Sequence, residues 1–322
     1  MAKKSKTAFV CTECGQEFSK WQGRCHSCGS WDTVTEFREA RGGSGRSRGA
    51  APQSTASVRQ LSTDAAPRSP RIASSFPEVD RALGGGLVPG SLVLVGGDPG
   101  IGKSTLLLQM LAQWAAQNRT VLYVSGEESM EQVSLRAARL GIGNAPVLFL
   151  AETTTESVID KVEQSKPEIV VIDSIQTMMC EELTGSPGSV SQVRESTALL
   201  LRFAKSRNTA VLLVGHVTKD GSIAGPRVLE HMVDAVISFE GDANYQYRIF
   251  RSIKNRYGPS GEIAVLTMSD RGLAEVKDAS DIFVQSVDTE QVGSAVVPVL
   301  EGSRVLPVEL QALVNHTHFG MP

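Results

Sequence analysis

The sequence predicts an α/β protein in which a mostly parallel sheet carries helices on both faces, with a small cysteine-rich module before it. Three observations predict this architecture. From about 71 to 270, short hydrophobic segments alternate with amphipathic helical segments, which is typical of a parallel sheet covered by helices. A glycine-rich segment, GGDPGIGKST, lies between one of these strands and a helix. Four of the five cysteines fall within the first 28 residues.

The bulk composition is that of a soluble globular protein of 322 residues, with 41% hydrophobic and 21% charged residues. No apolar run reaches the roughly 18 residues that a membrane span requires, and the basic start MAKKSK is followed by no hydrophobic signal core. We therefore expect a cytoplasmic protein without a disulfide framework. The formal net charge of −3 neither favours nor excludes nucleic acid, because a basic surface can be local.

Residues 1–38 are predicted to form a zinc module held by four thiolates. CTECG and CHSCG place Cys11, Cys14, Cys25 and Cys28 as two C-x-x-C pairs, ten residues apart. Each pair can form a knuckle with both sulfurs on one side, and two knuckles supply the ligands of a closed tetrahedral zinc site. Because so short a segment buries little apolar surface, we expect the metal to supply its folding energy. A redox dithiol or unrelated free thiols are the alternative.

The rest of the chain is divided by composition. Residues 39–70 contain almost no large apolar side chains and are predicted to form a flexible linker. The domain 71–270 is predicted to hold six buried strands and then an antiparallel ribbon. The expected buried strands are 91–97, 120–126, 145–151, 168–174, 209–216 and 234–241, and the expected ribbon strands are 247–256 and 262–270.

Residues 271–322 are predicted to begin a further domain. A turn at 301–303 divides the segment SAVVPVLEGSRVLPVELQALV into the two strands of a hairpin. The buried face of this hairpin is predicted from residues that alternate at period two, namely Val308, Leu310, Ala312 and Val314. A hairpin alone is marginal in water, so the segment either packs on the core or opens a domain cut short at Pro322.

The segment GDPGIGKS fits the phosphate-binding pattern G-x-x-x-x-G-K-[ST] in full, with a strand before it and a helix after it. Its glycines let backbone N–H groups face the phosphates, and the helix N-terminus adds partial positive charge. Lys103 is expected to bridge the β- and γ-phosphates, and the Ser104 hydroxyl to reach Mg²⁺. The predicted nucleotide contacts are Gly97, Asp98, Pro99, Gly100, Ile101, Gly102, Lys103, Ser104 and Thr105. A chance glycine turn is the alternative.

Side chains at the ends of three strands are candidates for ATP hydrolysis. Asp173 ends a buried strand, where an open α/β sheet positions its ligand, and is expected to hold the magnesium shell through water rather than only cap a helix. Because side chains alternate in an extended segment, one of Glu127 and Glu128 can face the γ-phosphate. We favour Glu127 as the base; both could instead only start the next helix. His216 is a candidate γ-phosphate sensor or a satisfied polar residue.

Lys254 and Arg256, in the stretch SIKNRYGPSG, are candidate cations for the transition state. Residues two apart on a strand point the same way, so both can reach one target while Asn255 faces away. A phosphoryl-transfer transition state spreads charge over several oxygens, and an added cation raises the rate by orders of magnitude. Spacing leaves open whether they reach their own nucleotide or a neighbour's, and a solvated basic edge is the alternative.

Five ordered motifs resemble the bacterial RadA (Sms) family of DNA repair proteins, relatives of the RecA recombinase and the DnaB helicase. They are CTECG…CHSCG, LGGGLVPGSLVLVGGDPGIGKSTLL, YVSGEES, VVIDSIQT and KNRYG. The resemblance covers essentially the whole chain and implies a RecA-like P-loop ATPase core. It also carries over the roles of the P-loop, of Glu127 and Asp173, and of the four cysteines. The family signature KNRFG stands here as KNRYG, with Tyr257 for Phe.

The resemblance further implies a ring-shaped hexamer with ATP between subunits, DNA in the central channel, and Lys254 and Arg256 on the adjacent subunit's nucleotide. The implied activity is a DNA-dependent ATPase that drives branch migration and unwinding of recombination intermediates. The implied cofactors are ATP, Mg²⁺ and Zn²⁺; the implied partners are single-stranded and branched DNA, the recombinase RecA and a replicative-helicase-type protein. The family continues into a large Lon-protease-like domain, of which 271–322 are expected to be the opening.

Two glycine-containing loops, 178–195 and 217–227, follow strands at the ligand end of the sheet. The resemblance to RecA-like rings implies that loops in these positions face the DNA channel. Arg194, Lys219 and Arg227 are the candidate phosphate contacts, since cationic grooves bind single strands with little sequence preference. A KaiC-like ATPase that remodels protein partners is one alternative function. A nucleotide-gated zinc-binding scaffold is another, and stimulation of ATP turnover by single-stranded DNA separates them.

Overall fold

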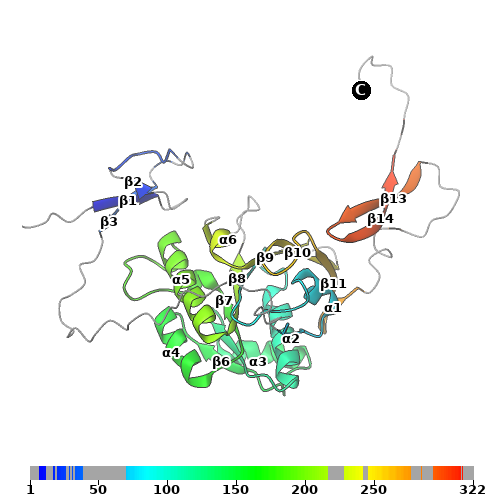
Figure 1. The fold of residues 1–322 in the computed structure, drawn as a ribbon, viewed down its shortest axis with the longest axis horizontal. Coiled ribbons are helices and arrows are strands. Elements are labelled where there is room, and N and C mark those ends of the chain that lie inside the picture. The colour runs from blue at the N-terminus through cyan, green and yellow to red at the C-terminus, as the bar shows by residue number, and fades with distance from the viewer. Residues whose placement is uncertain are drawn as a thin grey trace, which may run out of the picture.

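The fold is described from a computed structural model of the chain (Figure 1). The described residues are 7–11, 17–18, 20–26, 29, 31, 33–38, 70–216, 228–241, 246–276, 284, 293–312 and 314. Among them, no helix combines the length and the apolar character that crossing a membrane would require.

The N-terminal module is a three-stranded antiparallel sheet in the order β2-β1-β3. Its strands are β1 (Thr7–Cys11), β2 (Glu17–Phe18) and β3 (Val34–Arg38). Cys11, Cys25 and Val34 are buried and pack with Phe9 and Phe18 in one small cluster. The module therefore has a core of its own, in which two of the four predicted zinc ligands take part.

The main domain is built on one nine-stranded sheet in the order β12-β11-β10-β9-β4-β8-β7-β5-β6. Six neighbouring strands from β9 to β6 are parallel, namely β4 (Leu92–Gly97), β5 (Val121–Ser125), β6 (Leu148–Ala151), β7 (Ile169–Asp173), β8 (Ala210–His216) and β9 (Ala235–Glu240). Three antiparallel strands extend the β9 edge, namely β10 (Tyr247–Asn255), β11 (Ile263–Ser269) and β12 (Gly272–Glu275). The predicted ribbon is therefore part of the same sheet.

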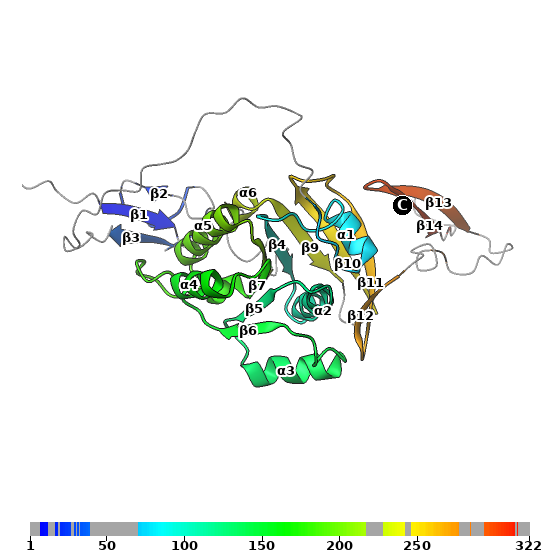
Figure 2. The same cartoon turned by 60° about the horizontal axis from the view of Figure 1, so that its bottom comes forward.

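Helices cover both faces of this sheet (Figure 2), as predicted. The helices are α1 (Pro77–Ala82), α2 (Lys103–Ala116), α3 (Met130–Arg139), α4 (Thr155–Ser165), α5 (Val190–Arg207) and α6 (Val228–Met232), with a 3₁₀ turn η1 (Ile175–Thr177). Along β4, Val93 and Val95 face α1 and α2, whereas Leu92 and Leu94 face α4 and α5. Because both faces are buried, the parallel strands are nearly continuous hydrophobic runs, which made them readable from sequence.

The C-terminal hairpin consists of β13 (Ser294–Glu301) and β14 (Arg304–Gln311), as the predicted turn requires. Its turn end contacts the main sheet, where Leu306 is buried against Ile263 and Val265. The prediction that the alternating residues up to Val314 form a buried face is wrong for its C-terminal part. Leu310 is 56% exposed and Val314 91% exposed, because only the turn end of the hairpin reaches the sheet (Figure 1).

Candidate nucleotide-binding site

The glycine-rich loop joins the carboxyl end of β4 to the amino end of α2, as its sequence predicts. Gly97 lies so close to β9 that a Cβ there would collide with the carbonyl oxygen of Phe239. Gly102 has a φ of +112°, a left-handed conformation that favours glycine, and a Cβ there would lie 2.6 Å from Met268 Cε. The loop conformation therefore depends on these two glycines.

Lys103 is held inside the loop. Its Nζ donates to the carbonyl oxygens of Gly97 at 2.7 Å and Asp98 at 2.8 Å, and only 4% of the residue is exposed. Burial lowers the pKa of Lys103, while the charges of Asp173, Asp98 and Glu127 act in the opposite direction. A phosphate group entering the loop would offer this ammonium a stronger acceptor than two neutral carbonyls.

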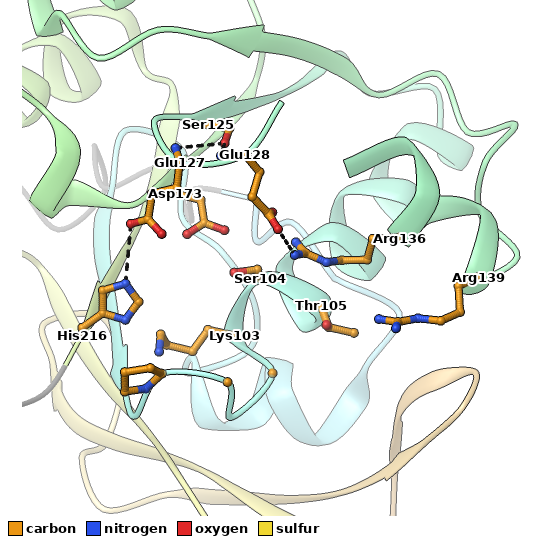
Figure 3. Close-up of a pocket in the computed structure, with 13 residues that line it drawn as sticks. Lys103, Ser104, Thr105, Ser125, Glu127, Glu128, Arg136, Arg139, Asp173 and His216 are labelled. Atoms are coloured by element: carbon orange, nitrogen blue, oxygen red, sulfur yellow. Dashed lines mark hydrogen bonds and ion pairs between the residues drawn. The ribbon is translucent and has the colours of Figure 1, made fainter. Parts of the chain in front are cut away.

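A cavity of about 360 Å³ opens above the loop (Figure 3). Its floor consists of Pro99, Gly100, Gly102, Lys103, Ser104 and Thr105. Its walls consist of Ser125, Glu127, Glu128, Arg136, Arg139, Asp173 and His216. The cavity thus brings together the phosphate-binding loop and the candidate side chains from the ends of three other strands.

Asp173 and the two glutamates occupy different positions in this cavity. Ser125 and Asp173 are paired across β5 and β7, and the Tyr123 hydroxyl donates to Asp173 Oδ2. Glu127 Oε1 accepts a hydrogen bond from Ser174 Oγ at 2.6 Å. Glu128 instead forms an ion pair with Arg136 (Figure 3). Glu127 is therefore next to the strand-end carboxylate, whereas Glu128 is bound to α3.

His216 ends β8 and faces the same group of side chains. Its Nε2 lies 3.7 Å from Glu127 Oε1. Its Nδ1 is buried and has no hydrogen-bond partner within the described part of the chain. His216 therefore lines the cavity beside Glu127, and its role stays a prediction.

Lys254 and Arg256 do not line this cavity. Lys254 Nζ donates to the carbonyl oxygens of Glu230 at 2.6 Å and Val233 at 2.9 Å, at the end of α6. Arg256 contacts the carboxylate of Asp234 at 3.3 Å. Both cations therefore reach one segment of their own chain, although Arg256 follows the end of β10 at Asn255 and does not lie on the strand as predicted. Burial, followed by the charge of Arg256, lowers the pKa of Lys254.

The predicted zinc site is described only in part, because Cys14 and Cys28 lie outside the described residues. Cys11 and Cys25 are both fully buried in the same cluster. Gly29, with a φ of +78°, donates its N–H to Cys25 O at 2.8 Å. Among the described residues no three metal-ligating side chains form a group. Two thiols in one core fit a four-cysteine zinc site.

Two family descriptions match the chain. An AAA domain matches residues 60–222, and a rubredoxin metal binding domain matches residues 9–36. The second match contains all four predicted zinc ligands. The first contains the phosphate-binding loop, both glutamates and Asp173, and it identifies the sheet as an ATPase-type core.

Curated relatives match along the whole chain. "DNA repair protein RadA" of Haemophilus influenzae is 49% identical over 325 residues, covering 100% of this chain and 71% of the relative. The chain belongs to the RadA family. Two further RadA proteins show the same similarity. The protein of Escherichia coli is 48% identical over 100% of this chain and 71% of the relative, and that of Bacillus subtilis is 46% identical over 99% of this chain and 70% of the relative. The resemblance predicted from the motifs is confirmed.

The DNA-contact residues expected for a RadA family member are described only in part. The loop predicted over 178–195 extends too far, because α5 already begins at Val190, so Arg194 lies on a helix and not in a loop, with its side chain exposed. Lys219 and Arg227 lie outside the described residues.

Five residues of the site were not predicted from the sequence. They are Tyr123 and Ser174, which contact the carboxylates, Ser125 in the cavity wall, and Arg136 and Arg139, which line the end of the cavity beside Thr105 (Figure 3). The two arginines are three apart on a helix that follows Glu128, and that spacing is a detectable signal. Ser174 directly follows Asp173, but its contact with Glu127 depends on which strands are neighbours.

Proposed function

We propose that this chain is a DNA-dependent ATPase that acts in DNA repair as a ring-shaped motor on recombination intermediates. The observation that carries the proposal is the cavity in which Lys103, Glu127 and Asp173 meet, in a chain of the RadA family. A phosphate-binding loop facing two carboxylates at the carboxyl ends of parallel strands suits hydrolysis of a nucleoside triphosphate.

Each residue has a proposed role in that reaction. The loop N–H groups and Lys103 bind the triphosphate, and Lys103 exchanges its two carbonyl partners for phosphate oxygens. Ser104 and Asp173 would hold Mg²⁺, which neutralises phosphate charge when bound. Glu127 accepts the proton of the attacking water, and His216 responds to the γ-phosphate through its contact with Glu127.

Lys254 and Arg256 are proposed to complete the site of a neighbouring subunit. The family resemblance implies that they contact the nucleotide of an adjacent copy, and their position outside the cavity of their own chain supports this proposal. Cations supplied in trans typically raise phosphoryl-transfer rates by about 10³ to 10⁵. Engagement would require Lys254 to leave the carbonyls at the end of α6, the helix that follows the proposed DNA loop 217–227.

ATP turnover with and without single-stranded DNA tests the function. We expect strong stimulation that weakens with salt, since phosphate contacts release counterions, and we expect Lys103→Ala to abolish turnover. Turnover indifferent to DNA would favour remodelling of a protein partner. Absence of turnover in the unmodified chain under all conditions would favour a nucleotide-gated scaffold.

Mixing of two inactive variants tests the shared site. Lys103→Ala lacks a functional phosphate-binding loop, and Lys254→Ala lacks one of the two proposed trans-acting cations. In mixed assemblies, some sites pair an intact loop of one subunit with an intact Lys254 of its neighbour, so partial recovery of turnover is expected. Lack of recovery over all mixing ratios, in assemblies shown to exchange subunits, would contradict a site shared between subunits.

A further inference from the structure

Ser174 is buried behind the cavity, and its hydroxyl points at the proposed base. The residue is 0% exposed, and Ser174 Oγ donates to Glu127 Oε1 at 2.6 Å. We propose that Ser174 is a positioning residue for hydrolysis, whose hydroxyl fixes Glu127 Oε1 so that Oε2 faces the attacking water. This inference rests on the proposed function.

The backbone around Ser174 is fixed on both sides. Its carbonyl oxygen accepts hydrogen bonds from Thr177 N at 3.2 Å and Thr177 Oγ1 at 2.8 Å, within the 3₁₀ turn η1. On the other side, Gly126 N donates to Asp173 O at 2.9 Å, which joins the segment after β5 to the end of β7. A Cβ on Gly126 would collide with Thr177. The donor and the acceptor therefore belong to segments in direct contact.

The two contacts made by the Glu127 carboxylate fall on the same oxygen. Ser174 Oγ and His216 Nε2 both approach Oε1, at 2.6 and 3.7 Å. Within the described residues no hydrogen bond or ion pair falls on Oε2. A carboxylate held through one oxygen can use the other to accept a proton. The Glu127 side chain is 45% exposed, so little packing would restrain it without this hydrogen bond.

The expected effect is on turnover and not on binding. A displacement of about 1 Å at a reacting group can cost roughly 100-fold in rate, so we expect Ser174→Ala to lower kcat about 10- to 100-fold. The KM for ATP and the affinity for a non-hydrolysable ATP analogue should stay within about twofold, because Ser174 does not line the cavity. Ser174→Thr keeps a hydroxyl and should recover much of the loss, and Ser174→Cys, a weak donor, should fall between.

A matched control is Ser91→Ala. Ser91 is 1% exposed, and in the described structure its Oγ has no hydrogen-bond partner. Loss of this hydroxyl should leave kcat unchanged. Thermal unfolding of each variant, with and without the analogue, separates loss of folded protein from loss of turnover.

A double-mutant cycle tests whether Ser174 acts through Glu127. Glu127→Asp shortens the side chain by one methylene and takes the carboxylate out of reach of Ser174. In that background, Ser174→Ala should lower kcat by less than about twofold. If the reductions in kcat caused by Ser174→Ala and Glu127→Asp instead multiply in full in the double variant, Ser174 acts independently of Glu127, and the proposal is overturned.

The outcomes separate this inference from the function on which it rests. If the unmodified chain hydrolyses ATP and Ser174→Ala keeps or exceeds its kcat, the positioning role fails and the ATPase stands. If the unmodified chain binds nucleotide without turnover, the proposed function itself fails. If Ser174→Ala does not fold, Ser174→Thr decides the question. A folded Ser174→Thr variant whose kcat is reduced 100-fold would overturn the positioning role, because this variant keeps the hydroxyl.

Discussion

At the scale of single residues, Tyr257 is the position where this chain departs from the KNRFG signature, and its hydroxyl has a partner. Lys205 Nζ donates to Tyr257 Oη at 2.9 Å and contacts the buried carboxylate of Asp234 at 2.6 Å. Asp234 also contacts Arg256. Burial lowers the pKa of Lys205, but the bonds to Asp234 and Tyr257 raise it overall. The hydroxyl of Tyr257 thus holds Lys205 against Asp234, and the Asp234 carboxylate in turn holds Arg256, one of the two proposed trans-acting cations.

Tyr257→Phe removes that hydrogen bond and nothing else. Because Lys205 is 45% exposed and keeps Asp234, the free energy of unfolding should fall by about 1 kcal/mol or less. Urea denaturation measures this loss, with Tyr247→Phe on the exposed end of β10 as the matched control. A loss of several kcal/mol, or one equal to that of the control, would show that the hydroxyl does not act through Lys205.

At the scale of elements, α1 depends on a side chain far along the sequence. Its N-cap residue, Phe76, offers no side-chain acceptor. Glu275, at the end of β12, supplies one: Glu275 Oε1 accepts from Glu78 N at 2.7 Å and from Val79 N at 3.0 Å. Burial raises the pKa of Glu275, against the effect of those two N–H groups.

The raised pKa gives a prediction for stability against pH. A carboxyl whose folded pKa lies above its unfolded value binds protons more tightly when folded, so its ionisation destabilises the fold as pH rises through the folded value. Glu275→Gln keeps an acceptor oxygen without the charge. The variant should be more stable than the unmodified chain at pH 8, and the difference should vanish as pH falls towards the ordinary value of 4.5.

Urea denaturation over a pH series measures this difference, and Glu152→Gln is a control of opposite sign. Backbone hydrogen bonds, above all from Thr154 N, lower the pKa of Glu152. The carboxylate therefore stabilises the fold above its unfolded pKa, and that contribution is lost as pH falls through the folded value. Glu152→Gln should be less stable at neutral pH and equal in acid. The same pH trend in both variants would contradict the assignment for Glu275.

The sequence predicted elements better than it predicted contacts between them. Asp173 was expected at the site because parallel strands share one carboxyl edge, a rule that holds whatever the strand order. The Ser174–Glu127 bond was not expected, because it requires β5 and β7 to be neighbours, and no local pattern states that order. Leu310 was expected to be buried, and it is exposed. Alternation predicts which side chains share a face of the hairpin, but it does not predict how much of that face another element covers.

At the scale of the whole molecule, the cavity residues lie at the carboxyl ends of the parallel strands. The C-terminal hairpin is attached elsewhere on the main domain, by an ion pair and a hydrogen bond. The turn end of the hairpin is held by Arg304 on Glu78 at 2.6 Å and by Ser303 N on Glu262 at 2.8 Å. Glu262 is 1% exposed and also pairs with Arg81 of α1. The hairpin, α1 and β11 therefore form one connected unit.

The N-terminal module, in contrast, should depend on its metal. Its described core holds only Cys11, Cys25 and Val34 with two partly buried phenylalanines, whereas the main domain has two large clusters. A core as small as the described one offsets little of the entropy of ordering the module, so we expect thiolate–zinc bonds to supply the difference. Removal of zinc should therefore unfold the module and leave the sheet intact.

Hydrogen exchange of the full chain, followed by mass spectrometry, measures both parts at once. A strong chelator should abolish amide protection in β1 and β3, which pair along Thr7–Cys11 and Val34–Arg38, while β4 and β8 stay protected and nucleotide affinity is unchanged. Cys11→Ser should show the same loss before chelation, with no further change after it. Protection of β1 that survives complete zinc removal would mean that the apolar cluster alone holds the module, and the metal would then have another role.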